Sequence, residues 1–200
     1  MSKVVDYYFA PQSPWTYLGH ERFVKLTQAV SAQVNVRPMD LGRVFPVSGG
    51  VQLKDRPKQR QDYRIMELKR FTKHLDVPLN LHPKFFPVDG SRASLLIIAV
   101  DQRDGVDAAL RLSGEIMAGV WAHEQNIADE ATLSQMLDKA GLSTENLALA
   151  QSAEVKALYD QYTDEAIKLG VFGAPTYVIE NELFWGQDRL DFVARALGVQ

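Results

Sequence analysis

Ser13 begins the segment of this chain with the clearest potential for chemistry. It stands directly before Pro14, and apolar residues then recur at helical spacing: Trp15, Leu18, Phe23, Leu26 and Val30. Ser13 is therefore the expected N-cap of a helix and Pro14 its first residue. Free backbone N–H groups and the positive end of the helix dipole favour an anion at that point. An ordinary capping serine would have the same neighbours, so Ser13 alone does not distinguish a cap from a binding site.

Any sulfur chemistry at Ser13 would use the sulfur of a ligand, because the chain contains no cysteine. This excludes disulfides, thiolate metal ligands and a protein thiol as nucleophile. A free thiol has a pKa of about 8.5, and a helix N-terminus lowers such values by roughly one to several units. A hydrogen bond from the Ser13 hydroxyl to a thiolate would stabilise the anion further. Ser13 is thus a candidate for holding and activating the thiol of a ligand.

Residues 186–188 could bind both ends of an α-amino acid. Gly186 precedes an expected helix that begins with Gln187 and Asp188. The N–H groups at a helix start bind a carboxylate, and Asp188 could pair with an amino group. The alternative is structural: Asp188 would be a helix cap and Trp185 a core residue.

The elements that must position these residues lie at the two ends of the chain. Residues 3–9 and 33–37 are the expected strands of a βαβ unit around the first helix. Two strands joined by a turn at Asn181-Glu182 are predicted over residues 176–180 and 183–185. A closing helix is predicted over residues 188–197. Residues 43–50 are expected to form a loop, and helices are expected over 57–74, 91–102, 106–123, 130–140 and 153–169.

This order predicts an α/β protein, a thioredoxin-like fold (βαβ + ββα) with an inserted all-helical domain. The expected division is residues 1–48 and 168–200 for the thioredoxin-like domain and 49–167 for the insertion. Ser13 and Thr16 then occupy the positions of the Cys-x-x-Cys pair of thioredoxin-type enzymes. Pro175 falls where those folds carry a cis-proline, which would leave the backbone of Ala174 available to an extended peptide ligand. The alternative is a trans proline leading into a strand.

Composition favours a small organic ligand over nucleic acid or a membrane. The formal net charge is −3, from 22 basic and 25 acidic residues spread along the chain, so no basic face is expected. Neither a targeting segment nor a membrane-spanning run is recognisable, and a cytoplasmic location is expected. The histidines lack metal-ligand spacing, so structural or solvated roles and no metal are expected: His20, His74, His82 and His123.

Three segments together resemble the kappa-class glutathione transferases and their bacterial relatives, the 2-hydroxychromene-2-carboxylate isomerases, which have a DsbA-like thioredoxin fold. They are Ser-Pro-Trp-Thr-Tyr-Leu at 13–18, Val-Phe-Gly-Ala-Pro-Thr at 171–176 and Gly-Gln-Asp-Arg-Leu at 186–190. The resemblance implies glutathione as cofactor, with Ser13 contacting its sulfur and Ala174, beside Pro175, bonding its cysteinyl part. It also implies that Gly186, Gln187 and Asp188 receive the γ-glutamyl end.

The resemblance further implies a glutathione-dependent isomerase of an aromatic carboxylate that acts by reversible thiolate addition, in a homodimer. Ser13 is the expected catalytic residue. Candidates for the substrate pocket are Phe45, Tyr63, Arg92 and Trp121, with Arg92 ranked first; core or surface packing is the alternative for each. A kappa-like glutathione transferase and a non-catalytic glutathione-binding module remain open. The chain departs from the family at Gly50, where relatives have Asn, and at Phe71, where they have Trp, so the substrate half is less well defined.

Overall fold

A four-stranded sheet forms the centre of the computed structural model, which describes residues 3–199. The strand order is β2-β1-β3-β4, with β1 Val4–Phe9, β2 Gln33–Pro38, β3 Thr176–Ile179 and β4 Glu182–Trp185. β1 runs parallel to β2 and antiparallel to β3, and β3 is antiparallel to β4. Helix α1, Pro14–Ala29, connects β1 to β2. The predicted βαβ and ββα halves and the thioredoxin-like fold are therefore confirmed.

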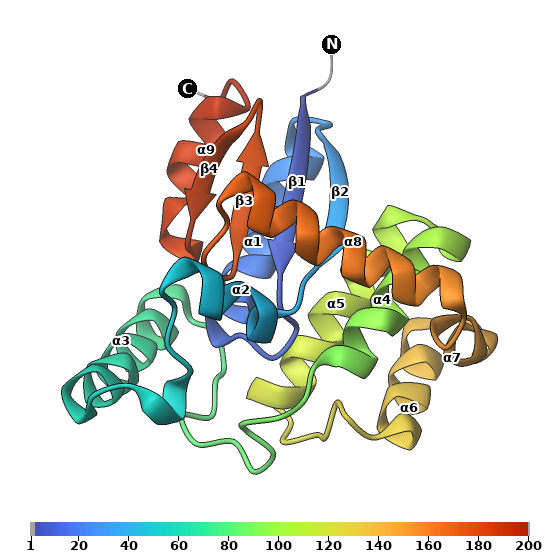
Figure 1. The fold of residues 1–200 in the computed structure, drawn as a ribbon, viewed down its shortest axis with the longest axis horizontal. Helices are drawn as coiled ribbons and strands as arrows, with labels where there is room; N and C mark the ends of the chain where they lie inside the picture. Colours follow the sequence, from blue (N-terminus) through green and yellow to red (C-terminus); the bar gives the residue numbers. More distant parts are fainter. Residues whose placement is uncertain (1–2, 200) are drawn as a thin grey trace.

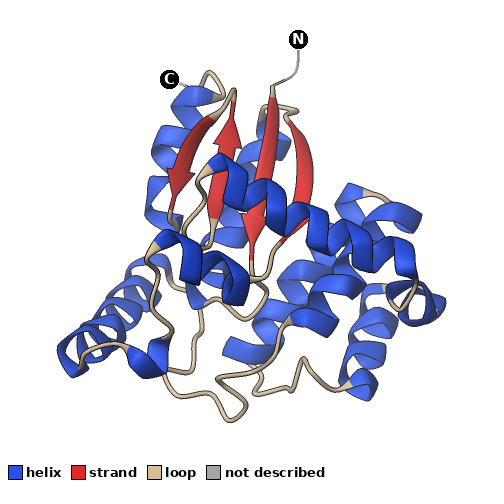
Figure 2. Ribbon diagram, in the orientation of Figure 1, coloured by secondary structure: helices blue, strands red, loops and turns tan. Residues whose placement is uncertain are grey.

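Helices make up the long segment between β2 and β3 and lie on both sides of the sheet (Figures 1 and 2). They are α2 Leu41–Ser48, the 3-10 helix η1 Leu53–Asp55, α3 Lys58–Leu75, α4 Ser91–Asp104, α5 Val106–Trp121, α6 Glu130–Ala140, α7 Glu145–Ala150 and α8 Ala153–Leu169. After β4 the chain ends with the 3-10 helix η2, Gln187–Arg189, and α9, Leu190–Ala196. Helix α3 projects away from the sheet (Figure 1), and Leu68 is its one buried residue.

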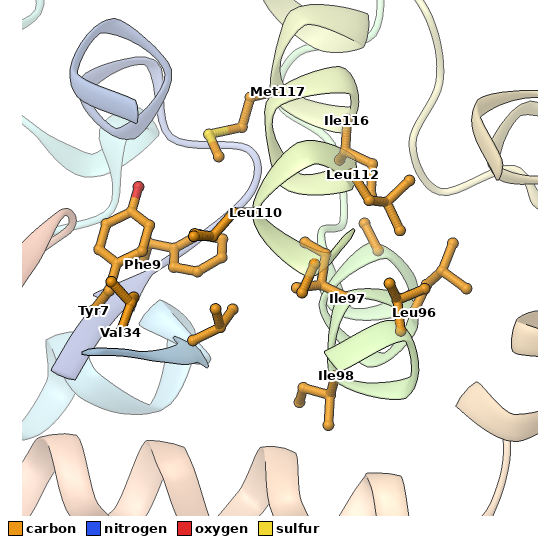
Figure 3. Packing of buried hydrophobic residues seen from close by; sticks show 14 of the residues in the cluster. Tyr7, Phe9, Val34, Leu96, Ile97, Ile98, Leu110, Leu112, Ile116 and Met117 are labelled. Carbon is orange, nitrogen blue, oxygen red and sulfur yellow. The ribbon is translucent and has the colours of Figure 1, made fainter. Parts of the chain in front are cut away.

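Strand β1 is buried on both faces. Successive side chains of a strand point in opposite directions, and those of β1 enter two separate apolar clusters. Tyr7 and Phe9 belong to the larger apolar cluster, which extends into α4 and α5 (Figure 3). Tyr8 faces a second cluster that includes Val44 of α2 and Ala166 of α8. The loop that follows β1 and carries Ser13 is thus fixed between two packed layers. Since the larger cluster runs from the sheet into the inserted helices, the division at residues 48/49 and 167/168 stays a prediction.

The expected loop at 43–50 is wrong, because these residues form most of α2. The Asp40 side chain caps this helix by accepting a hydrogen bond from the Gly42 N–H at 2.7 Å, and Gly49 ends it with φ of 75°. Arg43 adds ion pairs to Asp160 and Asp164 of α8 at 2.9 and 2.5 Å. Capping and contacts with α8 therefore outweigh the unfavourable Pro46 inside the helix.

Two smaller expectations also need correction. Helix α7 lies in a stretch for which no helix was expected, and its buried Asn146 donates a hydrogen bond to Asp104 at the end of α4, at 2.8 Å. The turn between β3 and β4 lies one residue earlier than expected, at Glu180-Asn181, where φ is 51° and 67°. Two successive left-handed residues match the right-handed twist of the strands that they join.

Candidate functional site

Ser13 is the N-cap of α1, as predicted. Its hydroxyl oxygen accepts a hydrogen bond from the Thr16 N–H at 3.3 Å, and its side chain is only 7% exposed. Because this bond uses the oxygen as acceptor, the hydroxyl proton is free to be donated. It points to the carbonyl oxygen of Ala174 across a long distance of 3.5 Å. A sulfur anion placed within hydrogen-bond distance of the Ser13 hydroxyl would be a stronger acceptor than that carbonyl.

The Ala174-Pro175 peptide bond is cis, as the fold predicted. Ala174 precedes β3, and its N–H donates to no acceptor in the part of the chain that the structure describes. The Pro175 carbonyl accepts from the Gly186 N–H at 2.9 Å, which joins this segment to the start of η2. Ala174 therefore has a free backbone donor beside the Ser13 hydroxyl, an arrangement suited to an extended peptide.

Gly186 places η2 beside Ser13's helix. Its φ of 109° favours glycine, and a Cβ there would lie 2.5 Å from a carboxylate oxygen of Asp188. Gln187 is buried, and its carbonyl accepts from the Arg22 guanidinium of α1 at 3.0 Å. Its side-chain Nε2 is buried without a hydrogen-bond partner. Asp188 is exposed and forms an ion pair with Arg189 at 2.6 Å.

Trp185 does not belong to the core, contrary to the structural alternative. Its side chain is 51% exposed, and it packs edge-on against Phe172 with ring centroids 4.7 Å apart. Its indole nitrogen would lie 2.4 Å from a Cβ at position 173. Gly173 thus allows the indole to lie against the loop that precedes the cis-proline, at the edge of the candidate site.

A cavity of about 530 Å³ lies between helix α3 and the segments that carry Ala174 and residues 186–189. It is lined by Ala174, Trp185 and residues 186–189 on one side and, on the other, by Trp15 of α1, Arg56 before α3, and Gln59, Arg60, Tyr63, Arg64, Glu67 and Phe71 of α3. Its volume falls within the roughly 300–1,000 Å³ of small-molecule sites. Ser13 is not a lining residue, and its hydroxyl reaches the wall at Ala174.

Of the predicted substrate residues, Tyr63 lines this cavity and is 53% exposed. Arg92 lies elsewhere, paired with Glu130 at 2.5 Å. Phe45 packs on Gly50 within the α2 segment, where a Cβ would meet its ring at 2.4 Å. Trp121 is fully buried beside Phe86, with ring centroids 4.7 Å apart. The structure therefore brings Tyr63, but not these three, to the cavity formed by the other site residues.

Three arginines of this cavity were not singled out from the sequence. Arg56, Arg60 and Arg64 follow one another at four-residue spacing in the sequence. Arg60 and Arg64 therefore lie on one side of α3, and Arg56 precedes the helix with extended backbone. That spacing is the signal that could have found them. Burial, together with the neighbouring positive charge of Arg56, lowers the pKa of Arg64 to about 10, which leaves it charged at neutral pH.

No metal-binding cluster of histidine or acidic residues occurs within residues 3–199. In the same part of the chain, none of the helices combines the length and hydropathy needed to span a bilayer.

Residues 4–198 match the family model described as a DSBA-like thioredoxin domain. A 2-hydroxychromene-2-carboxylate isomerase of Pseudomonas putida is 29% identical, with 98% of this chain and 94% of that protein covered. The human glutathione S-transferase kappa 1 is 22% identical, with 99% and 92% covered. A solved structure of a 2-hydroxychromene-2-carboxylate isomerase superimposes with a TM-score of 0.81 at 28% identity, covering 98% of this chain and 94% of the other.

Proposed function

This chain belongs to the family of DSBA-like thioredoxin domains, and we propose that it is a glutathione-dependent isomerase of an aromatic carboxylate. The observation that carries the proposal is the Ser13 hydroxyl, whose oxygen is occupied by the Thr16 N–H and whose proton is directed at the cavity wall. Similarity to isomerases named for 2-hydroxychromene-2-carboxylate over nearly the whole chain supports this reaction class.

The residues present fit glutathione. The free Ala174 N–H suits its cysteinyl backbone, and the unpartnered Nε2 of buried Gln187 and the carboxylate of Asp188 suit the α-amino acid at its γ-glutamyl end. When bound, glutathione would supply a thiolate whose reversible addition turns a double bond of the substrate into a single bond that can rotate.

The protein's own contribution is binding and electrostatic stabilisation. Ser13 donates a hydrogen bond to the sulfur anion, and the first turn of α1 adds the favourable end of its dipole. Ala174 fixes the cysteinyl part of the peptide, which carries that sulfur, and Asp188 fixes its γ-glutamyl end. Trp15, Phe71 and Trp185 give the cavity aromatic walls for an aromatic substrate.

The direct test is the position of the glutathione sulfur in crystals soaked with glutathione. We expect it within hydrogen-bond distance of the Ser13 hydroxyl. A tripeptide bound outside the cavity would refute the proposal.

A glutathione transferase is the second candidate, favoured by the similarity to kappa-class enzymes. The two activities differ in their thiol balance, because an isomerase releases glutathione unchanged and a transferase consumes one per turnover. Incubation with 2-hydroxychromene-2-carboxylate, followed by thiol titration, separates them. We expect the thiol concentration to stay constant while substrate is converted; a stoichiometric loss would select the transferase.

Asp188→Asn is expected to raise KM for glutathione about 10-fold and to leave kcat nearly unchanged. The reason is that Asp188 would hold the ammonium group in the ground state and in the transition state alike. Steady-state kinetics with varied glutathione measures this. Asp191→Asn is the matched control, since Asp191 is an exposed acid of the next helix, α9. An equal effect of both changes, or a fall in kcat alone, would contradict the role of Asp188.

A homodimer in the cytoplasm also forms part of this proposal, on the basis of the family resemblance. Sedimentation velocity would show a species of about twice the 22.4 kDa chain mass, and a monomer at all concentrations would contradict it.

A further inference from the structure

The guanidinium of Arg64 lies over two aromatic rings. Its guanidinium carbon lies 5.3 Å from the ring centroid of Phe86 and 5.8 Å from that of Trp121. Trp121 is fully buried and packs on Phe86, so this aromatic support belongs to the protein core. Cation–π contact fixes where the guanidinium lies and gives it no hydrogen-bond acceptor.

Arg64 has no acceptor or counter-ion in the part of the chain that the structure describes, although it is half-buried. Among the other charges of the cavity, Arg60 likewise has no partner in the described residues, but its side chain is exposed, whereas Arg64 is half-buried. The remaining charges are already bonded. Asp188 pairs with Arg189, Glu67 pairs with Arg70, and the Arg56 Nε donates to the Val51 carbonyl at 2.8 Å. A half-buried guanidinium has five N–H donors and a charge, and both favour an anion at the open side.

The anion that fits Arg64 is not the γ-glutamyl carboxylate of glutathione. That end is assigned to η2, which belongs to the thioredoxin-like half. Arg64 lies on α3 and contacts Phe86, in the loop between α3 and α4, and Trp121 of α5. Trp15 and Phe71 line the same cavity and contact each other edge-on, with centroids 6.1 Å apart. An aromatic ring that enters beside them could carry its carboxylate to Arg64.

We propose that Arg64 determines specificity for the carboxylate of the aromatic substrate, which it binds through its free guanidinium N–H groups while Phe86 and Trp121 hold the guanidinium in place. This role rests on the proposed function. Arg64 thereby takes the role of binding the substrate carboxylate, for which the sequence favoured Arg92.

The test measures binding and needs no turnover. Protein saturated with glutathione is titrated calorimetrically with 2-naphthoate and with the neutral 2-naphthamide. Arg64→Met is expected to weaken 2-naphthoate about 10- to 100-fold, the effect of losing a charge-assisted hydrogen bond, and to change 2-naphthamide less than about twofold. Arg64→Lys is expected to retain an intermediate affinity, since it keeps the charge without the planar pair of donors.

Arg103→Met is the control, because Arg103 of α4 pairs with Glu145 of α7 and lies outside the cavity. Glutathione affinity, measured in the same instrument, separates the two proposals. If glutathione binds normally but Arg64→Met leaves 2-naphthoate unchanged, the role of Arg64 is refuted and the proposed function stands. If Arg64→Met weakens glutathione as much as 2-naphthoate, Arg64 serves the peptide instead. Failure of the unmodified protein to bind glutathione would refute the proposed function itself.

Discussion

Ser13→Ala is expected to raise the pKa of the bound glutathione thiol by about one to two units. The substitution removes the hydroxyl proton that Ser13 can donate, and a hydrogen bond to a charged group contributes about 1.5–3 kcal/mol, where each pKa unit corresponds to about 1.36 kcal/mol. The thiolate absorbs in the ultraviolet, so a pH titration of the complex measures the shift directly. At pH 6.5 the same change is expected to lower kcat/KM about 10- to 100-fold, because the thiolate fraction falls with it.

The pH dependence distinguishes this role from a structural one. Above the raised thiol pKa the variant again carries thiolate, so we expect much of its rate to return at alkaline pH. A folding defect would not recover in this way. Loss of the N-cap bond to Thr16 costs stability as well, about 1 kcal/mol, and this cost needs a control of its own.

Ser152→Ala provides that control. Ser152 caps α8 as Ser13 caps α1, accepting from the Val155 N–H at 3.2 Å, and it lies outside the cavity. It should lose similar stability and keep the thiol pKa and the rate. A thiol pKa that stays at its solution value in the unmodified protein, or one that Ser13→Ala leaves unchanged, would contradict the assignment.

The geometry of the proposed glutathione half of the site could be predicted because local backbone chemistry defines it. A serine before a proline marks a helix start, and a proline before a strand marks the loop beside it. Gly186 marks a backbone conformation that other residues rarely adopt. Each of these signals is read within a few residues and depends little on how distant helices pack. The structure accordingly places Ser13, Ala174 and Gly186 next to one another.

The substrate half depends on how α3 is placed, which local sequence does not determine. Arg92 and Arg64 are both arginines on helices, and only tertiary packing decides that one faces Glu130 and the other the cavity. Trp121 is an aromatic residue of the kind that lines substrate pockets, but on α5 its side chain points into the core. The missed helix α2 has the same cause, because a helix that contains Pro46 is stabilised by its cap and by α8 rather than by its own propensity.

His20 has a structural role, one of the two roles expected for it from the sequence. Its ring is buried, with Nε2 at 2.8 Å from the Leu110 carbonyl and Nδ1 at 3.2 Å from the Tyr7 hydroxyl. Since a carbonyl only accepts, the neutral ring donates from Nε2 and accepts the Tyr7 proton at Nδ1. Burial lowers the pKa of His20 to about 4, although the bond to Leu110 opposes the shift.

This depressed pKa makes the free energy of unfolding depend on pH. In the unfolded chain His20 has a pKa of about 6.5, so between pH 6.5 and 4 the unfolded state binds a proton that the folded state does not. The contribution of His20 is therefore fully present above pH 6.5 and is lost as the pH falls to 4. Urea unfolding at pH 7 and pH 4.5 should show a loss from this group of about 2 kcal/mol.

Other groups also titrate in this range, so the variants must isolate His20. His20→Gln is expected to be less stable at pH 7, because a buried bond to Leu110 or Tyr7 is lost or weakened, and to lose about 2 kcal/mol less than the unmodified protein on acidification. His123→Gln should keep the full pH dependence, because His123 is exposed. If His20→Gln were as sensitive to acid as the unmodified chain, the pKa of His20 would be the same in the folded and unfolded states. The folded protein would then carry a protonated His20 at pH 4.5, with Nδ1 donating to the Tyr7 hydroxyl.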